Sequence, residues 1–366
     1  MSKWEFSVKV RINTKEVFDE KGTMRAEARN AMRALGLVIL LLASSQIILL
    51  TSIETQTREL RELPTRYDSD NTQVAKISIG VDHTCAIGTA NQMKCWGSGE
   101  EGKTGHENIE NYGDAEEEMG LFLPFTDVGA GLTFSEVSAG EYHTCAIVSD
   151  STVKCWGVNA LLGSSAGEEG TCSKGDGYLE MGANVDSVKL GSWNATYLSA
   201  GFSHTCAVVN NSTADSLVCW GKNSDGQLGL GHTDFVGDTD AMLESDVLPH
   251  VDLPDRGVGL SQVAAGKRHT CILWDDGEIA CWGNNVYGQL AIGSTDTIGD
   301  EDSEMGDSLT LVDLPSDRSA SSIEAGEDVT CAILDNGDLS CWGLGTDGRL
   351  GNEDVVNWGD SSNELG

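Results

Sequence analysis

The chain has little proline, few aromatic residues and few basic residues. Its 366 residues include 5 Pro, 6% aromatic residues, and 23 Lys and Arg against 58 Asp and Glu. Little proline with 44 Gly is what many short strands joined by turns require. The formal charge is −35, and an acidic body of this kind repels nucleic acid and anionic lipid headgroups. We therefore predict a globular protein that has no nucleic-acid partner.

Long apolar runs are also scarce, with one exception. Residues 34–53 carry no charge over 20 positions, the length that crosses a hydrocarbon core of about 30 Å as a helix. A buried core helix is disfavoured because the run has no polar stripe and lies outside the repeats described below. A cleaved signal peptide ending near Ala43-Ser44-Ser45 remains an alternative, but the leader of 33 residues is long and apolar residues continue beyond that point.

The charges on either side of this run predict its orientation. Eight Lys and Arg and five Asp and Glu precede it, so the body that follows carries a charge near −38. The positive-inside rule keeps the N-terminus cytoplasmic, which predicts a single-pass type II membrane protein with an extracellular or lumenal domain. The predicted parts are a cytoplasmic leader (1–33), a transmembrane signal-anchor helix (34–54) and a juxtamembrane linker (55–73).

One motif recurs five times in the remainder of the chain. A Gly precedes His-Thr-Cys, about ten residues of hairpin follow, and Cys-Trp-Gly closes the unit. The copies run from Gly80 to Gly97, Gly140 to Gly157, Gly201 to Gly221, Gly266 to Gly283 and Gly326 to Gly343, with Val329 in place of His in the last. A period of about 60 residues indicates a repeat architecture.

The cysteines of each unit lie symmetrically about a turn such as Asp275-Asp276-Gly277, so they face each other across an antiparallel pair. Reduced, buried cysteines are the alternative, and the export signal favours disulfides. The predicted pairs are Cys85–Cys95, Cys145–Cys155, Cys206–Cys219, Cys271–Cys281 and Cys331–Cys341. Cys172 has no partner in the pattern, and a free thiol, an intermolecular bridge or an inert surface residue all remain open. The predicted glycosylation sites are Asn194, Asn210 and Asn211.

Ala-Gly-x-x-His-Thr-Cys-Ala, Cys-Trp-Gly and Asn-x-x-Gly-Gln-Leu-Gly resemble the regulator of chromosome condensation repeat family in an exported, cysteine-paired form. The resemblance covers residues 74–366 and implies an all-β β-propeller, usually of seven blades. Five repeats are visible, so the chain is either a fragment of a seven-bladed propeller or a five-bladed ring, in which Leu63-Pro64 marks a strand for closure. The approximate repeats are 74–133, 134–194, 195–259, 260–319 and 320–366.

Two kinds of metal site are conceivable from the sequence. His83, Cys85 and Cys95 would offer one His per cysteine pair, without the tight Cys spacing of structural zinc, so a His packed between blades is favoured. Acidic segments supply the oxygen ligands of weak Ca²⁺ binding but not the EF-hand spacing, and solvated loops are favoured. These segments are Asp114 with Glu116–Glu118, Asp238 with Asp240, and Asp300 with Asp302 and Glu304. We predict no cofactor.

The repeats contain no unique polar constellation, and we recognise no Gly-x-Ser-x-Gly, no phosphate-binding loop and no Cys-x-x-Cys redox motif in the chain. The Trp of each Cys-Trp-Gly is expected to pack between blades (Trp96, Trp156, Trp220, Trp282 and Trp342). We therefore predict a non-enzymatic, membrane-anchored recognition or scaffold domain that binds a protein or glycan partner through its loops. The alternatives are an intracellular guanine-nucleotide exchange factor for a Ran-like GTPase and a secreted-type protein inhibitor. The oligomeric state is left open.

Overall fold

The computed structural model describes residues 73–164, 173–237, 247–315, 318–362 and 364–365. The predicted leader and membrane span, Cys172 and the acidic pair at 238 and 240 lie outside these residues. Among the residues described, no helix has the length and apolar character needed to cross a membrane.

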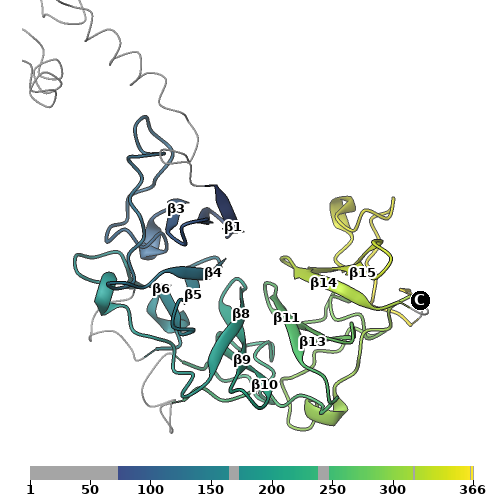
Figure 1. The fold of residues 1–366 in the computed structure, drawn as a ribbon. Helices are drawn as coiled ribbons and strands as arrows, with labels where there is room; N and C mark the ends of the chain where they lie inside the picture. Colours follow the sequence, from purple (N-terminus) through teal and green to yellow (C-terminus); the bar gives the residue numbers. More distant parts are fainter. Residues whose placement is uncertain (1–72, 165–172, 238–246, 316–317, 363, 366) are drawn as a thin grey trace, which may run out of the picture. The chain divides into compact units, whose positions relative to one another are not determined.

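Five small antiparallel sheets follow one another along the chain (Figure 1). The first sheet contains β1 Val74–Ile79, β2 His83–Gly88 and β3 Met93–Gly97, and the second contains β4 Phe134–Ala139, β5 His143–Val148, β6 Val153–Val158 and β7 Ser173–Lys174. The third sheet contains β8 Asn194–Ala200, β9 His204–Asn210 and β10 Asp215–Gly221, and the fourth contains β11 Leu260–Ala265, β12 His269–Trp274 and β13 Ile279–Gly283. The fifth sheet contains β14 Ala320–Ala325, β15 Val329–Leu334 and β16 Leu339–Gly343. The described helices are short 3-10 turns: η1 Glu100–Gly102, η2 Asn159–Leu161, η3 Gly182–Asn184, η5 Gly306–Ser308 and η6 Thr346–Gly348. The all-β prediction is confirmed, whereas ring closure and blade number stay predictions.

The apolar segment near the end of a repeat pairs with its hairpin through a single bridge. His250 pairs with Val218 and Leu311 pairs with Ala280 as isolated bridges. Within the described ranges, the second sheet alone has a fourth strand, the two-residue β7 beside β6. These apolar segments are therefore held beside their sheets by single bridges and not by continuous ladders.

The register places the two cysteines of each hairpin directly opposite each other, as the symmetry of the turns predicts. All five predicted disulfides are present, with Cα–Cα separations of 4.1 Å. The third hairpin keeps this pairing although its cysteines are 13 residues apart, because its extra residues extend the turn and the register is unchanged. Each disulfide joins two neighbouring strands of the same sheet.

The hydrophobic core lies between consecutive sheets. We call the side of a sheet that packs on the following sheet its trailing face, and the side that packs on the preceding sheet its leading face. Between the first two sheets, Cys85, Ile87 and Met93 of the trailing face contact a cluster that includes Val137 and Trp156 of the next leading face. The disulfides of the first four sheets belong to trailing faces, so they also fill the space between sheets.

Candidate functional site

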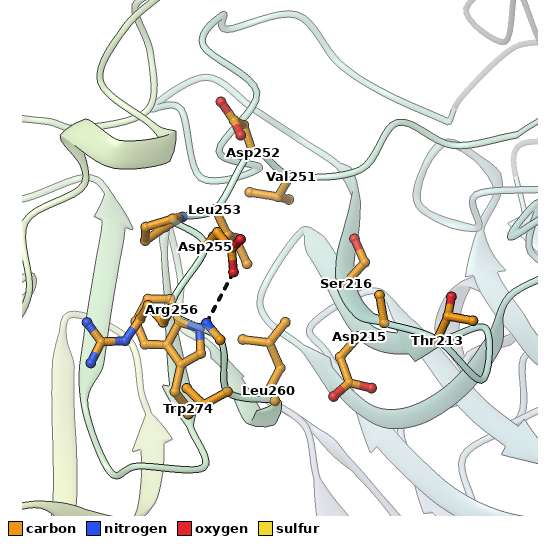
Figure 2. A pocket seen from close by; sticks show the side chains of 15 residues that line it. Thr213, Asp215, Ser216, Val251, Asp252, Leu253, Asp255, Arg256, Leu260 and Trp274 are labelled. Carbon is orange, nitrogen blue, oxygen red and sulfur yellow. Dashed lines mark hydrogen bonds between the residues drawn. The ribbon is translucent and has the colours of Figure 1, made fainter.

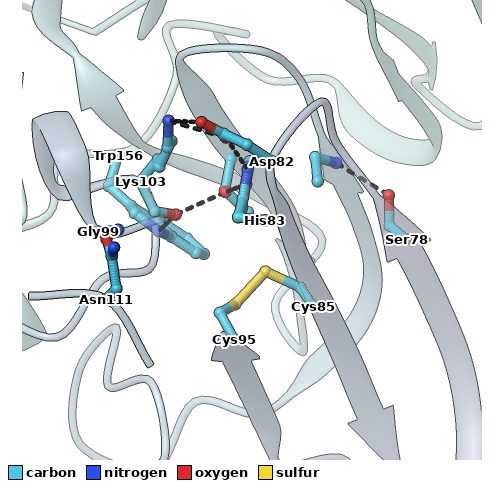
Figure 3. A network of polar contacts seen from close by, with 11 residues as sticks. Ser78, Asp82, His83, Cys85, Cys95, Gly99, Lys103, Asn111 and Trp156 are labelled. Carbon is cyan, nitrogen blue, oxygen red and sulfur yellow. Dashed lines mark hydrogen bonds and ion pairs between the residues drawn. A yellow bond between two sulfur atoms is a disulfide. The ribbon is translucent and has the colours of Figure 1, made fainter. Parts of the chain in front are cut away.

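The His of the repeated motif joins each sheet to the next. Its Nε2 lies 2.6–2.9 Å from the hydroxyl of the Thr in the following motif, in the pairs His83–Thr144, His143–Thr205, His204–Thr270 and His269–Thr330. The Thr144 hydroxyl itself donates to the carbonyl of Lys103 at 2.7 Å (Figure 3). Because its hydrogen is used there, the hydroxyl accepts from His83, which requires the Nε2–H tautomer.

The Trp of the motif completes the same network. Its indole Nε1 donates to a backbone carbonyl of the preceding repeat at 2.9–3.1 Å, in the pairs Trp156–Lys103, Trp220–Leu161, Trp282–Gln227 and Trp342–Gln289. All four rings are 0% exposed. Packing of Trp between blades is thus confirmed for these four, whereas Trp96 in the first sheet is only half-buried.

A glycine three residues before each His is explained by close approach. A Cβ atom at Gly140 would lie 2.6 Å from Cε1 of His143 and 2.5 Å from the carbonyl oxygen of Gly201. Both distances are far below van der Waals contact, so a side chain here would push the imidazole and the next sheet away. The Gly-x-x-His spacing is therefore a packing requirement of the joint between sheets.

The four motif histidines are buried and neutral. Burial lowers the pKa of His143 and His204 to about 3 and the pKa of His83 and His269 to about 4. At His83, the nearby Lys103 ammonium adds to this lowering of the pKa. The network is therefore a set of neutral hydrogen bonds at neutral pH, and it holds the sheets together.

The disulfides bear on the first metal hypothesis, and weak Ca²⁺ binding stays untested. Cys85 and Cys95 are joined in a disulfide, so they offer no thiolate to a metal beside His83. In the described ranges, no group of three or more His, Cys, Asp or Glu is placed to hold a metal ion. The acidic segment at 238–240 lies outside those ranges.

The other acidic segments use one carboxylate to bind their own backbone. Glu118 accepts the N–H groups of Gly113, Asp114 and Ala115 at 2.8–3.1 Å. These bonds lower the pKa of the Glu118 carboxyl. Glutamates at the same place in later repeats do likewise, namely Glu180, Glu304 and Glu364. The Gly-Asp to Glu-Met-Gly pattern is thus a structural turn in which a carboxylate fills a nest of N–H groups.

Two short catalytic-type patterns do occur in the chain, which corrects the sequence analysis. Residues 97–104 read Gly-x4-Gly-Lys-Thr, the letters of a phosphate-binding loop. That motif needs a helix after the loop and a free lysine, but here only the three-residue turn η1 is present, and Lys103 is buried with its Nζ 2.8 Å from Asp82 (Figure 3). Residues 163–167 read Gly-x-Ser-x-Gly, and Ser165 lies outside the described residues.

A surface groove between the third and fourth sheets is the candidate binding site. Its volume is about 530 Å³. Figure 2 shows Thr213, Asp215 and Ser216 on one side and Arg256 with Trp274 on the other. The first group belongs to the tip of the β9–β10 hairpin, and the second comes from the segment before β11 and the end of β12. The groove therefore exists only because two sheets pack together.

The groove contains a cationic and aromatic pair. The Arg256 guanidinium lies 5.1 Å from the centre of the Trp274 ring and donates to Asp276 at 2.8 Å. Asp215, Asp252 and Asp255 also line the groove. Stacking on the indole and the ion pair together hold the guanidinium in one orientation.

Trp274 was not singled out by the sequence analysis. The equivalent positions in the other four hairpins hold Gly88, Val148, Val209 and Leu334. The signal that could have indicated this site is an aromatic residue at a position where the other four repeats have none.

The sequons lie on the third sheet. Asn194 and Thr196 are exposed on β8, so this acceptor is accessible. The Asn211 side-chain oxygen accepts from the backbone N–H of Thr213 and Ala214 at the hairpin tip. Glycosylation at Asn194, Asn210 and Asn211 stays a prediction.

Five segments of the chain match the family model of the regulator of chromosome condensation (RCC1) repeat: residues 74–103, 134–161, 195–227, 260–289 and 320–349. A second model of the same repeat matches residues 216–273. The chain belongs to this repeat family, and its sheets are β-propeller blades of this type.

The chain is also similar to named proteins. It is 26% identical over 339 residues to the ultraviolet-B receptor UVR8 of Arabidopsis thaliana, covering 80% of this chain and 70% of that protein. It is 30% identical over 303 residues to human HERC4, a probable E3 ubiquitin-protein ligase, covering 71% of this chain and only 26% of that protein. The crystal structure of human WBSCR16 is similar in fold, with a TM-score of 0.52 and 16% identity over 80% of this chain and 82% of that one.

Proposed function

We propose that this protein is a non-enzymatic, membrane-anchored recognition domain that binds a protein or glycan partner in the groove between its third and fourth blades. The observation that carries the proposal is that the polar side chains repeated from blade to blade already form hydrogen bonds within the fold. The motif His, Thr and Trp side chains bond to the neighbouring sheet, and the glutamates of the acidic segments bond to their own turns. The groove is where the chain departs from the repeat and presents side chains outward.

The charge of the groove favours a partner with positive groups. Three aspartates line it, namely Asp215, Asp252 and Asp255, and Arg256 is already paired with Asp276. The chain as a whole carries −35. Complementary charges increase the association rate and lose their effect as salt is added, so we expect binding to weaken with ionic strength.

The membrane anchor is the second part of the proposal. The charge-free run of residues 34–53 and the basic leader before it support a type II orientation. The five disulfides support an oxidising compartment for the propeller. A protease-protection assay on sealed membranes tests this directly: the propeller should be protected inside vesicles or exposed on intact cells, opposite to the leader.

A matched pair of variants tests the groove. Asp255→Lys reverses one charge of the groove, whereas Asp335→Lys reverses an exposed aspartate of the fifth blade, which lies 3.5 Å from Arg318. Partners captured by the full chain from extracellular extract or on a glycan array should be lost with the first variant and kept with the second. Equal capture by both variants would place the binding site elsewhere.

A further inference from the structure

The leading face of the first sheet has the residues of an interface, but no sheet of the described residues packs against it. Ile77 is 60% exposed and Ile79 is 72% exposed. In the other four sheets, the residues at the position of Ile77 are only 1–5% exposed, namely Val137, Leu198, Val263 and Ile323. Each of those residues is covered by the sheet before it.

The trailing face of the fifth sheet is open in the same way. Ile333 is 47% exposed and Leu339 is 68% exposed. Their equivalents in the first four sheets are 0–3% exposed, namely Ile87, Ile147, Val208 and Leu273 for the first and Met93, Val153, Leu217 and Ile279 for the second. The disulfide Cys331–Cys341 on this face is half-buried, whereas the other four lie at 0–2% exposure.

The polar groups of these two faces also match. Among the described residues, neither the Thr84 hydroxyl nor the Trp96 indole makes a hydrogen bond, although their equivalents bond to the preceding repeat. In other joints, one backbone carbonyl accepts both of these hydrogen bonds, and it belongs to the residue at the position of Lys103 and Gln289. In the fifth repeat that residue is Arg349, which is exposed.

We propose that the leading face of the first blade binds the trailing face of the fifth blade of a second copy of this chain. The same two kinds of face form all four joints within one molecule, so this contact would continue an interface that the structure already contains. Among the described residues, no blade of the same molecule covers either face. Val329 replaces the joining His, so this joint has one hydrogen bond fewer than the internal ones.

Such a contact uses different patches on the two copies. Each molecule keeps one free face after the first contact, so association continues beyond a dimer unless the ring of copies closes. This property separates the proposal from a symmetric dimer, in which both copies use the same face.

Two substitutions on exposed residues test it. Ile77→Lys blocks only the leading face, and Leu339→Glu blocks only the trailing face. Sedimentation velocity of the full chain in mild detergent should show concentration-dependent oligomers for the wild type and monomers for each variant alone. An equimolar mixture of the two variants should form dimers and nothing larger, because one intact face of each kind remains. Val286→Lys, on an exposed loop of the fourth blade, is the matched control and should associate like the wild type.

Three results would overturn the proposal. A wild type that is monomeric at every concentration would show that these faces do not bind each other between copies. Dimers of Leu339→Glu alone would show contact between two leading faces. Oligomers that survive in both variants would show association through another part of the chain, residues 34–53 included. Unchanged melting temperatures of the variants confirm that the substitutions left the fold intact.

Discussion

Acid should open the joints between blades, because four of them each contain a buried neutral histidine. The pKa of His143 and His204 is lowered to about 3 in the folded chain, and that of His83 and His269 to about 4. In the unfolded chain an imidazole has its ordinary pKa near 6.5. Above that value neither state binds the proton, and the full stability is present.

The sign and the size of the effect follow from proton linkage. As pH falls from about 6.5 towards about 4, the unfolded chain takes up protons that the folded chain excludes, so the free energy of unfolding decreases. At about pH 5 each histidine accounts for a loss of about 2 kcal/mol, and the four together for about 8 kcal/mol. That sum is comparable to the whole stability of a typical domain, about 5–15 kcal/mol.

The assay compares His204→Gln with the wild type by denaturant unfolding between about pH 7.5 and about pH 5, followed by tryptophan fluorescence. The variant should lose about 2 kcal/mol less than the wild type over this range, since glutamine carries no titrating group. Val329→Gln is the matched control, because the fifth hairpin has no imidazole at this position, and it should keep the wild-type pH dependence. Identical pH dependence of His204→Gln and the wild type would refute the reasoning, as would NMR titration of His204 near its ordinary pKa.

Three further predictions concern single features of the repeat. Trp282→Phe removes a buried indole hydrogen bond and should lower the free energy of unfolding by about 1 kcal/mol in denaturant melts, whereas Trp96→Phe, which has no such bond, should lower it less. Graded reduction of the folded protein, followed by alkylation and mass spectrometry, should open Cys331–Cys341 first because it is the half-exposed pair, and simultaneous opening of all five would contradict this. Expression in a glycosylating host should give a glycan on the exposed Asn194, and Asn194→Gln should remove its mass; an unshifted wild type would count against export.

Much of the repeat could be predicted because its determinants are local. The two cysteines of a hairpin lie at equal distances from the turn, so antiparallel pairing brings them opposite each other whatever surrounds the sheet. The His and Trp residues recur with one spacing, and large or polar side chains repeated in this way belong to the contact between repeats. Their exact partners required the structure: a Thr hydroxyl of the following repeat for the His, and a backbone carbonyl of the preceding repeat for the Trp.

Some short sequence patterns are poor predictors because the same residues occur in more than one kind of structure. The acidic segment around Glu118 reads as a solvated or cation-binding loop, but its carboxylate binds three N–H groups of its own turn. The letters at 97–104 match a phosphate-binding loop, yet Lys103 is buried against Asp82. In both cases the backbone conformation decides which groups the charge meets, and short motifs do not encode that conformation.

The hairpins, the disulfide pairs and the all-β repeat follow from the amino-acid sequence, since all of these depend on contacts within about 15 residues of chain. Tertiary structure alone decided what lies between the repeats. The groove at Trp274 joins a hairpin tip of the third blade to a segment before the fourth. The open faces at Ile77 and Leu339 have the same residue types as the buried faces, and only the presence or absence of a packed neighbour distinguishes them. Burial is a property of what a side chain contacts, and here those contacts come from other repeats.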